Sequence, residues 1–292
     1  MASSAHAHRR IRAAIGDPPL IDLKTTAIII LMTGGFPVAG WLYHQGQLPA
    51  WATVLIGTFL MNLSFTAWHE PAHQNYSRYR WVNVAAGWLT SFASVYPGYF
   101  ARRREHLIHH RYEGIEGKDP VYPRIQSSFW SFPLTLLREA VSAKPLDVPD
   151  SFIRMTRGQR ISDAASNLLA LGVIAASVAG GFWQAVVLVW VVPRLIIFLA
   201  HAYYVCFFPH NHGGDGFVVA RIQKDLPILQ LLTMNQHLHG IHHRWPWIPW
   251  HKYQEVLHSF PEEVSAALDE HDHAPELTSE LKSTETAAEA RP

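Results

Sequence analysis

Four long apolar stretches constrain the fold of this chain more than any other feature. Each approaches or exceeds the roughly 20 residues that a helix needs to cross the hydrocarbon core of a bilayer. They cover residues 26–43, 49–68, 164–182 and 183–208. Arg194 and His201 are the main polar interruptions, and both fall in the last stretch. We therefore predict an all-α integral membrane protein with four transmembrane helices.

The connections between these stretches predict their topology. Only residues 44–48 join the first two stretches, and the last two follow one another directly, which predicts two helical hairpins. Lys and Arg are absent from both hairpin turns, but they are abundant before the first stretch, between the second and third, and after the fourth. By the positive-inside rule, both termini and the long middle segment are expected to be cytoplasmic. The middle segment and the residues after 208 would then form a cytoplasmic helical cap.

Composition sets the remaining boundaries. We predict a cytoplasmic N-terminal segment at 1–25, a membrane-bound domain at 26–260, and a polar, disordered tail at 261–292. Two weaker apolar segments, 81–100 and 129–137, are expected to lie at the membrane interface or to re-enter it. The net charge of +1 argues against nucleic-acid binding.

The chain contains 19 histidines, and most of them fall into tight groups. His69 and His73 are four residues apart, a spacing that puts two side chains on one face of a helix, although Pro71 favours a kink between them. A His-x-x-His-His pattern then occurs twice, at 106–110 and at 239–243. A further group, His210 and His212, follows the last apolar stretch.

Joint metal ligation explains these groups with one assumption, because burying so many unpaired imidazoles would be costly. Imidazole suits Zn, Cu, Fe and Ni, and the single cysteine, Cys206, excludes a site built from several thiolates. Eight or more histidines exceed the needs of one ion, so two metals are predicted. Redox iron is favoured over a zinc hydrolase, which usually adds carboxylate ligands. A metal transporter would place its ligands near the middle of the bilayer, whereas these groups lie at or beyond the ends of the spans.

The sequence around the histidines resembles that of the membrane fatty-acid desaturase and hydroxylase superfamily. The stretches HEPAHQNYSRYRWVN, REHLIHHRYEGIEGKDP and HLHGIHHRWPWIPWHKY are most similar to desaturase-like β-carotene hydroxylases, with β-carotene ketolases as near neighbours. The resemblance covers roughly residues 25–260.

The resemblance implies a set of iron ligands, carried over position by position. These are His69, His73, His106, His109, His110, His210, His239, His242 and His243. For the ligand after the last span, His201 and His212 compete with His210. His237 occupies the place at which family members often carry Asn, and Asn235 lies two residues before it. The acidic residues that could orient imidazoles are Glu70, Asp119 and Asp215.

The resemblance also implies an activity. The expected enzyme is a non-haem di-iron oxidoreductase that uses O2, and a ferredoxin-like electron-transfer protein supplies its electrons. Its substrate would be lipophilic, and the expected reaction is hydroxylation of a carotenoid ring, as in the conversion of β-carotene to zeaxanthin. Fatty-acid desaturation or hydroxylation and carotenoid ketolation are the alternatives. The basic run Arg102, Arg103 and Arg104 is a candidate contact for the electron donor or for anionic lipid headgroups.

Overall fold

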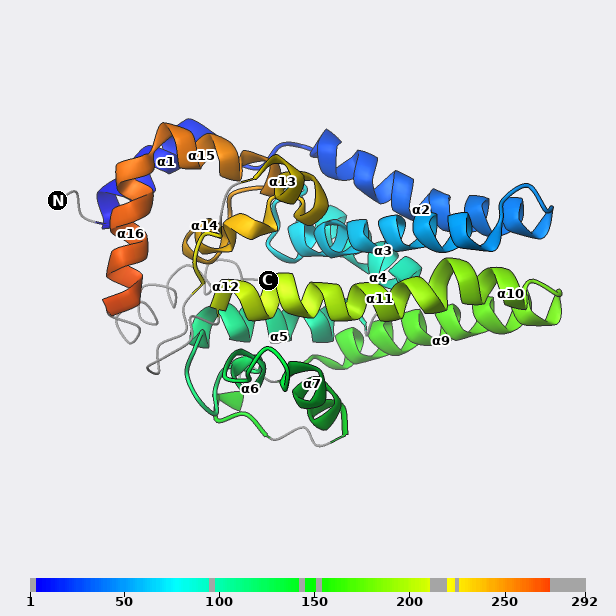
Figure 1. The fold of residues 1–292 in the computed structure, drawn as a ribbon. Helices are drawn as coiled ribbons and strands as arrows, with labels where there is room; N and C mark the ends of the chain where they lie inside the picture. The colour runs from blue at the N-terminus through cyan, green and yellow to red at the C-terminus, as the bar shows by residue number, and fades with distance from the viewer. Residues whose placement is uncertain are drawn as a thin grey trace. The chain divides into compact units, whose positions relative to one another are not determined.

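A computed structural model describes residues 4–94, 98–141, 145–150, 154–210, 220–223 and 226–273 of the chain. Within these ranges the regular secondary structure is helical and contains no strand (Figure 1). The chain divides into two compact units. The first unit comprises Met1–Asp17, Arg104–Arg154 and Ala202–Pro292, and the second comprises Pro18–Arg103 and Met155–His201. Each unit combines segments that are far apart in the sequence.

Four helices are long and apolar enough to cross a membrane, as predicted from the sequence. They are α2 (Leu23–His44), α3 (Ala50–Ala72), α9 (Arg157–Ala179) and the continuous segment Trp183–His210. This last segment consists of α10 (Trp183–Val186), the π-helix η1 (Val187–Val191), α11 (Val192–His201), the π-helix η2 (Ala202–Phe207) and α12 (Phe208–His210). That these spans form two membrane hairpins remains a prediction.

Two spans begin at side chains that satisfy free backbone amides. Asp22 accepts a hydrogen bond of 2.7 Å from the backbone N–H of Thr25 at the start of α2. At the start of α9, Thr156 and Gln159 form a reciprocal capping box. These caps explain why α2 and α9 begin several residues before the apolar stretches that define them in the sequence.

A glycine allows α3 to approach the last span closely within the second unit. A Cβ atom at Gly57 would lie 2.5 Å from the carbonyl oxygen of Val189 in η1 and 2.8 Å from Cγ of Pro193. No larger residue fits there without displacing the backbone of η1. The second unit therefore packs α2, α3, α11 and η1 together, as Figure 1 shows, and α4 (Arg80–Ser94) packs on α3.

The predicted interfacial segment at 81–100 divides into two helices. The first, α4, has 15 residues and is too short to span a bilayer. The second, α5 (Tyr99–Tyr112), begins where Asp163 of α9 accepts hydrogen bonds from the backbone N–H groups of Phe100 and Ala101, at 3.0 and 2.9 Å. A side chain from a distant span thus fixes the first turn of the helix that carries the second histidine pattern.

The first unit is built from short helices around its own apolar core. Its remaining helices are α1 (Ser4–Ile15), α6 (Tyr122–Ile125), α7 (Phe132–Val141), α13 (Pro227–Thr233), the 3-10 helices η3 (Gln236–Leu238) and η4 (Trp250–Lys252), α14 (His239–Arg244), α15 (Tyr253–Ser259) and α16 (Pro261–His273). The core joins Ile11 of α1 to Ile241, Trp245 and Tyr253.

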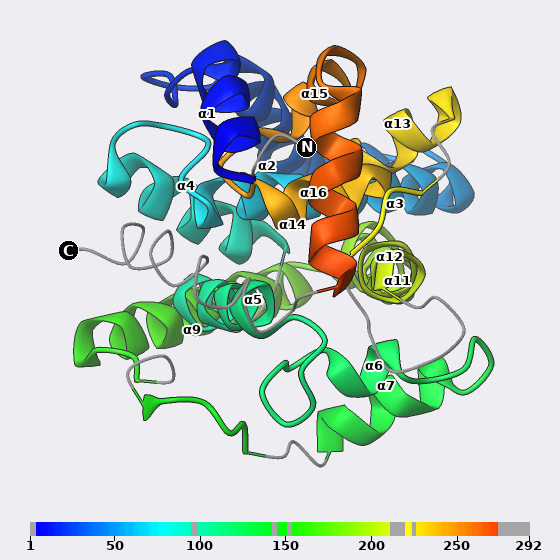
Figure 2. The same ribbon diagram turned by 90° about the vertical axis from the view of Figure 1, so that its left-hand side faces the viewer.

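The expectation of a disordered tail from residue 261 is wrong for its first 13 residues. These residues form α16, which lies beside α1 and α15 in Figure 2. Val264 and Ala267 are buried in the core, and Glu263 forms an ion pair with Arg10 of α1. The polar composition of 261–273 concealed a helix whose few apolar residues share one face. Residues 274–292 lie outside the described residues.

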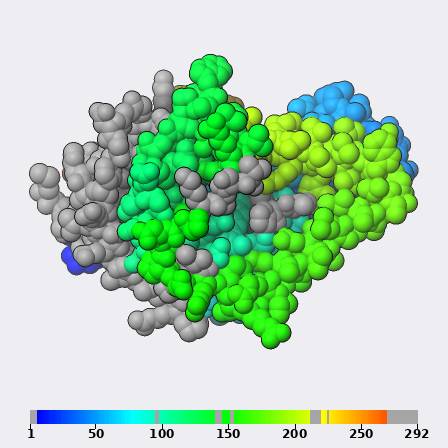
Figure 3. Space-filling view, turned by 90° about the horizontal axis from the view of Figure 1, so that it is seen from below, coloured from blue at the N-terminus to red at the C-terminus, as the bar shows by residue number. Residues whose placement is uncertain are grey.

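The segment around α7 carries exposed apolar side chains. Trp130 is 87% exposed, and Leu134 and Leu137 are 49% and 63% exposed. Leu134 and Leu137 lie three residues apart on α7 and form one apolar stripe, and Trp130 lies in the turn before that helix. The green segment that includes α6 and α7 lies on the molecular surface shown in Figure 3. This stripe suits contact with lipid at the bilayer interface, as expected for 129–137.

Candidate metal centre

The two His-x-x-His-His patterns fall on two helices of the first unit, and each pattern divides between two groups of histidines. In α5, His106 and His110 point into one group and His109 points into the other. In α14 the assignment is reversed, because His242 joins the first group and His239 and His243 join the second. Each helix therefore contributes two side chains four residues apart to one group and one side chain to the other.

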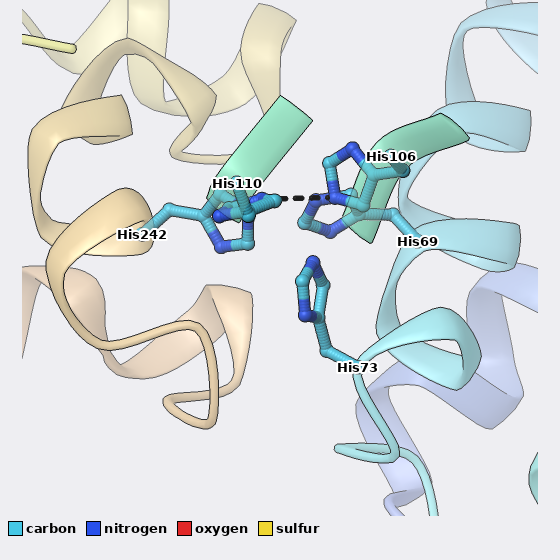
Figure 4. Close-up of side chains that lie close together, drawn as sticks. All are labelled: His69, His73, His106, His110 and His242. Atoms are coloured by element: carbon cyan, nitrogen blue, oxygen red, sulfur yellow. Dashed lines mark hydrogen bonds between the residues drawn. The ribbon is translucent and has the colours of Figure 1, made fainter. Parts of the chain in front are cut away.

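The first group contains His106, His110 and His242. Nε2 of His110 lies 3.1 Å from Nε2 of His106 and 2.9 Å from Nε2 of His242 (Figure 4). The ligand nitrogens of the three lie within 4.8 Å of one another. Three imidazole nitrogens that converge at this separation are placed as they would be around a common ion.

The second unit holds the remaining pair of predicted ligands. His69 lies in the last turn of α3 and His73 is its C-cap residue, so the helix continues through Pro71. Both are buried, with ring centroids 4.9 Å apart (Figure 4). Phe65, one turn earlier, stacks on His69 at 4.9 Å. The expected face-sharing arrangement of the two imidazoles is therefore present on α3.

The second group lies entirely within the first unit. It contains His109, His210, His239 and His243, all buried, with ligand atoms within 4.8 Å of one another. Nε2 of His243 lies 3.0 Å from Nε2 of His239. Among the described residues, His210 rather than its competitor His201 belongs to this group.

Carboxylates face the outer nitrogens of the second group. His109 Nδ1 lies 2.9 Å from Oδ1 of Asp119, whose two oxygens also accept hydrogen bonds from the backbone N–H groups of Gly114 and Val121. Glu113 faces two imidazoles at once: its Oε1 is 3.3 Å from His210 Nδ1 and its Oε2 is 2.9 Å from His243 Nδ1. Such partners fix the tautomer and orientation of histidines that bind metals.

The carboxylate partners favour proton positions on these imidazoles that are compatible with metal binding. A carboxylate accepts, so Nδ1 of His109 carries the proton and donates to Asp119, and the nearby Glu113 carboxylate favours the same tautomer in His210 and His243. Their Nε2 atoms then present lone pairs. Burial lowers the pKa of His243 well below its usual range despite the neighbouring carboxylate, so this imidazole is neutral. Nε2 of His210 is buried and makes no hydrogen bond in the described residues. Convergent buried lone pairs are costly unless a cation satisfies them.

In the first group, a phenol takes the place of a carboxylate at His242. The hydroxyl of Tyr253 lies 3.0 Å from His242 Nδ1, and Tyr253 is fully buried. In the second unit, Oε1 of Glu70 lies 3.3 Å from His69 Nδ1, as an orienting residue would. Each of the two patterned helices is thus held by polar side chains on the outer side of its imidazoles.

Several predicted site residues lie outside both groups. Nε2 of His201 lies 3.2 Å from Oδ1 of Asn62, and His237 Nδ1 lies 3.2 Å from the hydroxyl of Thr233. Asn235 adopts a left-handed conformation (φ 63°) and donates to the carbonyl of Trp250. These three residues therefore have structural partners. His212 and Asp215 lie outside the described residues.

Sequence reasoning missed Glu113 and Tyr253. Glu113 follows His109 by four residues but lies in the turn after α5, and the imidazoles that it faces, His210 and His243, belong to distant segments. Tyr253 lies in another helix, eleven residues from the imidazole that it contacts. No spacing rule connects two such positions.

The basic run before the second pattern contacts α3. The guanidinium carbon of Arg102 lies 3.6 Å from the centroid of the Trp68 ring, and Arg103 Nε donates to the carbonyl of Ala72 at 2.7 Å. These contacts give two of the three arginines a role in holding the end of α3. That these arginines dock an electron donor stays a prediction.

Comparisons with known proteins identify the family. The sequence profile described as fatty acid desaturase matches residues 46–274. Over 108 residues the chain is 31% identical to the sn-1 linoleoyl-lipid 6-desaturase of Arthrospira platensis, an alignment that covers 35% of this chain and 28% of that relative. The matched part is less than a third of the relative's length. With its four candidate spans and its two groups of histidines, the chain is an integral membrane protein that belongs to the fatty acid desaturase family.

Proposed function

We propose that the protein is a di-iron, O2-dependent oxidoreductase that attacks an unactivated C–H bond of a lipophilic substrate. The observation that carries the proposal is that the histidine nitrogens converge in two separate sets. The first set includes His106, His110 and His242. From the resemblance to the desaturase and hydroxylase superfamily, we expect His69 and His73 to be iron ligands as well. The second set, His109, His210, His239 and His243, would hold the other ion.

The donor set favours iron. Imidazole ligands without thiolate suit iron, zinc and copper, and the oxidative chemistry of the family selects a redox metal. When bound, the two irons supply the oxidising power that, with O2 and electrons from an external ferredoxin-like protein, removes a hydrogen atom from an unactivated carbon.

The residues of the chain orient and shield that centre. Asp119 accepts from Nδ1 of His109, and the Glu113 carboxylate lies 3.3 Å from Nδ1 of His210 and 2.9 Å from Nδ1 of His243, which favours tautomers whose Nε2 atoms are free to bind a metal. Of the seven histidines that the first unit contributes to the two groups, six are buried and His106 is half-buried, which limits access of water. A lipophilic substrate would be drawn from the bilayer, which the four candidate spans are long and apolar enough to cross. We place both termini and the metal centre on the cytoplasmic side, because Lys and Arg avoid the two short connections.

For the substrate we propose a carotenoid ring, hydroxylated at an unactivated ring carbon. The support is the similarity of the HEPAHQN and HHRWPWIPW stretches to carotenoid hydroxylases. The tryptophans of the second stretch do not add to it. Trp245, Trp247 and Trp250 pack in or against the apolar core of the first unit with Ile11 and Tyr253, so their bulk is explained by folding.

Acyl-lipid desaturation is the second candidate. The match to a linoleoyl-lipid desaturase favours it, and hydroxylation and desaturation share the first hydrogen abstraction. The ligands are common to both reactions, so the position of the substrate decides the product. Carotenoid ketolation is a third outcome of the same chemistry.

Expression in a host that makes β-carotene tests the substrate. We expect zeaxanthin or its mono-hydroxylated precursor by chromatography with the wild-type chain, and unchanged pigment with His242→Ala. A keto-carotenoid would assign ketolation instead. Unchanged pigment with new unsaturated or hydroxylated fatty acids would assign the acyl-lipid reaction. Unchanged pigments and unchanged lipids in a host with active ferredoxin would contradict the proposed oxidation.

A further inference from the structure

Helix α4 of the second unit has its apolar side chains on the outside and its polar side chains on the inside. The outer face of α4 consists of the residues of 81–94 that are not buried, and all of them are apolar: Trp81, Val82, Val84, Ala85, Trp88, Leu89 and Phe92. The polar residues of the same stretch are all buried: Asn83, Thr90, Ser91 and Ser94. A helix at the surface of a water-soluble protein has the opposite arrangement, with its apolar stripe facing the core. We propose that α4 is inserted in the bilayer, with its outer face in contact with lipid acyl chains.

The outer face is continuous along the helix. Trp81, Ala85, Trp88 and Phe92 follow one another at intervals of four, three and four residues, which places them along one side of α4. Trp81 alone is 73% exposed. The sequence contains no charged residue in 81–101. An exposed apolar surface of this kind marks a contact with a membrane or with another protein.

Three of the four polar side chains of α4 find their hydrogen-bond partners within the same unit. The hydroxyls of Thr90 and Ser94 donate to the backbone carbonyls four residues earlier, at 2.9 and 2.7 Å. Asn83 Nδ2 donates to the carbonyls of Ser77 and Tyr79, at 2.6 and 3.0 Å. These groups need no water, so placing the helix in hydrocarbon does not leave them unsatisfied.

The two ends of α4 lie at different depths along the spans of the second unit. Just before α4, the backbone N–H of Arg78 donates to the carbonyl of Pro19, which precedes α2, at 2.9 Å. At the other end, the carbonyl of Ala93 accepts a hydrogen bond of 2.8 Å from Trp190 Nε1. The ring of Trp190 lies 5.9 Å from that of Phe36, past the middle of α2. Helix α4 therefore descends from the level at which α2 begins toward the middle of that span.

The neighbours of α4 favour lipid over a protein partner as the occupant of the outer face. In Figure 1, α4 lies against α3, and it also packs on α2 and α9, so three of its neighbours are candidate spans. Exposed apolar residues of these spans, such as Val38 (57%), would contact the same lipid. Fifteen residues at 1.5 Å each give roughly 22 Å, which is enough to enter a hydrocarbon core of about 30 Å but not to cross it. A protein interface usually has a polar rim, whereas the outer face of α4 lacks charge over its whole length.

Spin labels on the outer face test the insertion, and the test does not depend on the metal centre. Ala85→Cys and Leu89→Cys are made in a Cys206→Ser background, labelled with a nitroxide and reconstituted in phosphatidylcholine vesicles. Electron paramagnetic resonance then measures the collision rates of each label with O2, which concentrates in hydrocarbon, and with a water-soluble nickel chelate. Val38→Cys on α2 is the reference for lipid, and Gln47→Cys, in the exposed turn between α2 and α3, is the reference for water.

We expect the ratio of O2 to nickel collisions at both α4 positions to resemble that of Val38→Cys. The ratio should be higher at Leu89→Cys than at Ala85→Cys, because Leu89 lies further along the descending helix. Ratios like that of Gln47→Cys would overturn the inference, since the outer face would then meet water. Low collision rates with both reagents would overturn it as well, because a second copy of the chain or another protein would cover the face. If Leu89→Cys does not fold, Phe92→Cys makes the same comparison.

Discussion

Tyr99 holds the first histidine pair in place from outside the metal centre. Its ring is 1% exposed, and its hydroxyl donates to the carbonyl of Pro71, between His69 and His73, at 3.0 Å. Burial raises the pKa of Tyr99 to about 12, so the phenol stays protonated and able to donate at any physiological pH. The ring fits there because residue 87 has no side chain.

Gly87→Ala should destabilise the fold because of this contact. A Cβ atom at position 87 would lie 2.1 Å from Cε2 of Tyr99, so the ring or α4 must move. Overpacking of this kind costs about 1–3 kcal/mol. Thermal unfolding in detergent should show a lower midpoint. Gly172→Ala in α9 is the matched control, because nothing lies within 4 Å of its Cβ position, and it should not be destabilising. Equal midpoints for Gly87→Ala and wild type would refute the packing of Tyr99 on α4.

At the level of elements, the start of α5 depends on a side chain from another span. Asp163 of α9 accepts from two backbone amides in the first turn of α5, and a Cβ atom at Gly98 would lie 2.1 Å from its carboxyl carbon. The glycine and the aspartate therefore form one contact. It ties α9, which carries no histidine, to the helix that presents three of them.

Asp163→Ala should cost about 0.5–2 kcal/mol in stability, the usual price of losing a helix cap. Asp163→Asn should cost less, because its side-chain oxygen still accepts a hydrogen bond. Hydrogen exchange followed by mass spectrometry should show faster exchange in the first turn of α5 in Asp163→Ala, with the capping box of α9 as an internal reference. Unchanged exchange in that turn would mean that Asp163 does not cap the helix.

The four candidate spans could be predicted from the sequence because length and hydropathy determine a transmembrane helix. Their exact ends could not, since Asp22 and Thr156 extend α2 and α9 through caps. Helix α16 was hidden because its apolar positions, Val264 and Ala267, are sparse within a charged segment.

For the metal site, too, contacts within one helix could be predicted from the sequence, whereas contacts between distant segments could not. The spacing in each His-x-x-His-His pattern predicts a shared patch on a helix. It does not predict that His109 and His242 turn away from their neighbours into the opposite group, because that depends on how α5 and α14 face each other. The selection of His210 over His201 has the same cause: Asn62 and Phe65 engage His201.

The complete protein is expected to bind two ions, one for each group of histidines. The most direct measurement is the iron content of the purified chain beside that of His109→Ala, His242→Ala and the control His258→Ala, whose side chain is exposed. We expect two irons per chain in the wild type and in His258→Ala, and about one in each of the other variants. Two irons per chain in both His109→Ala and His242→Ala, or no iron in the wild type, would contradict the binding of one ion by each group of histidines.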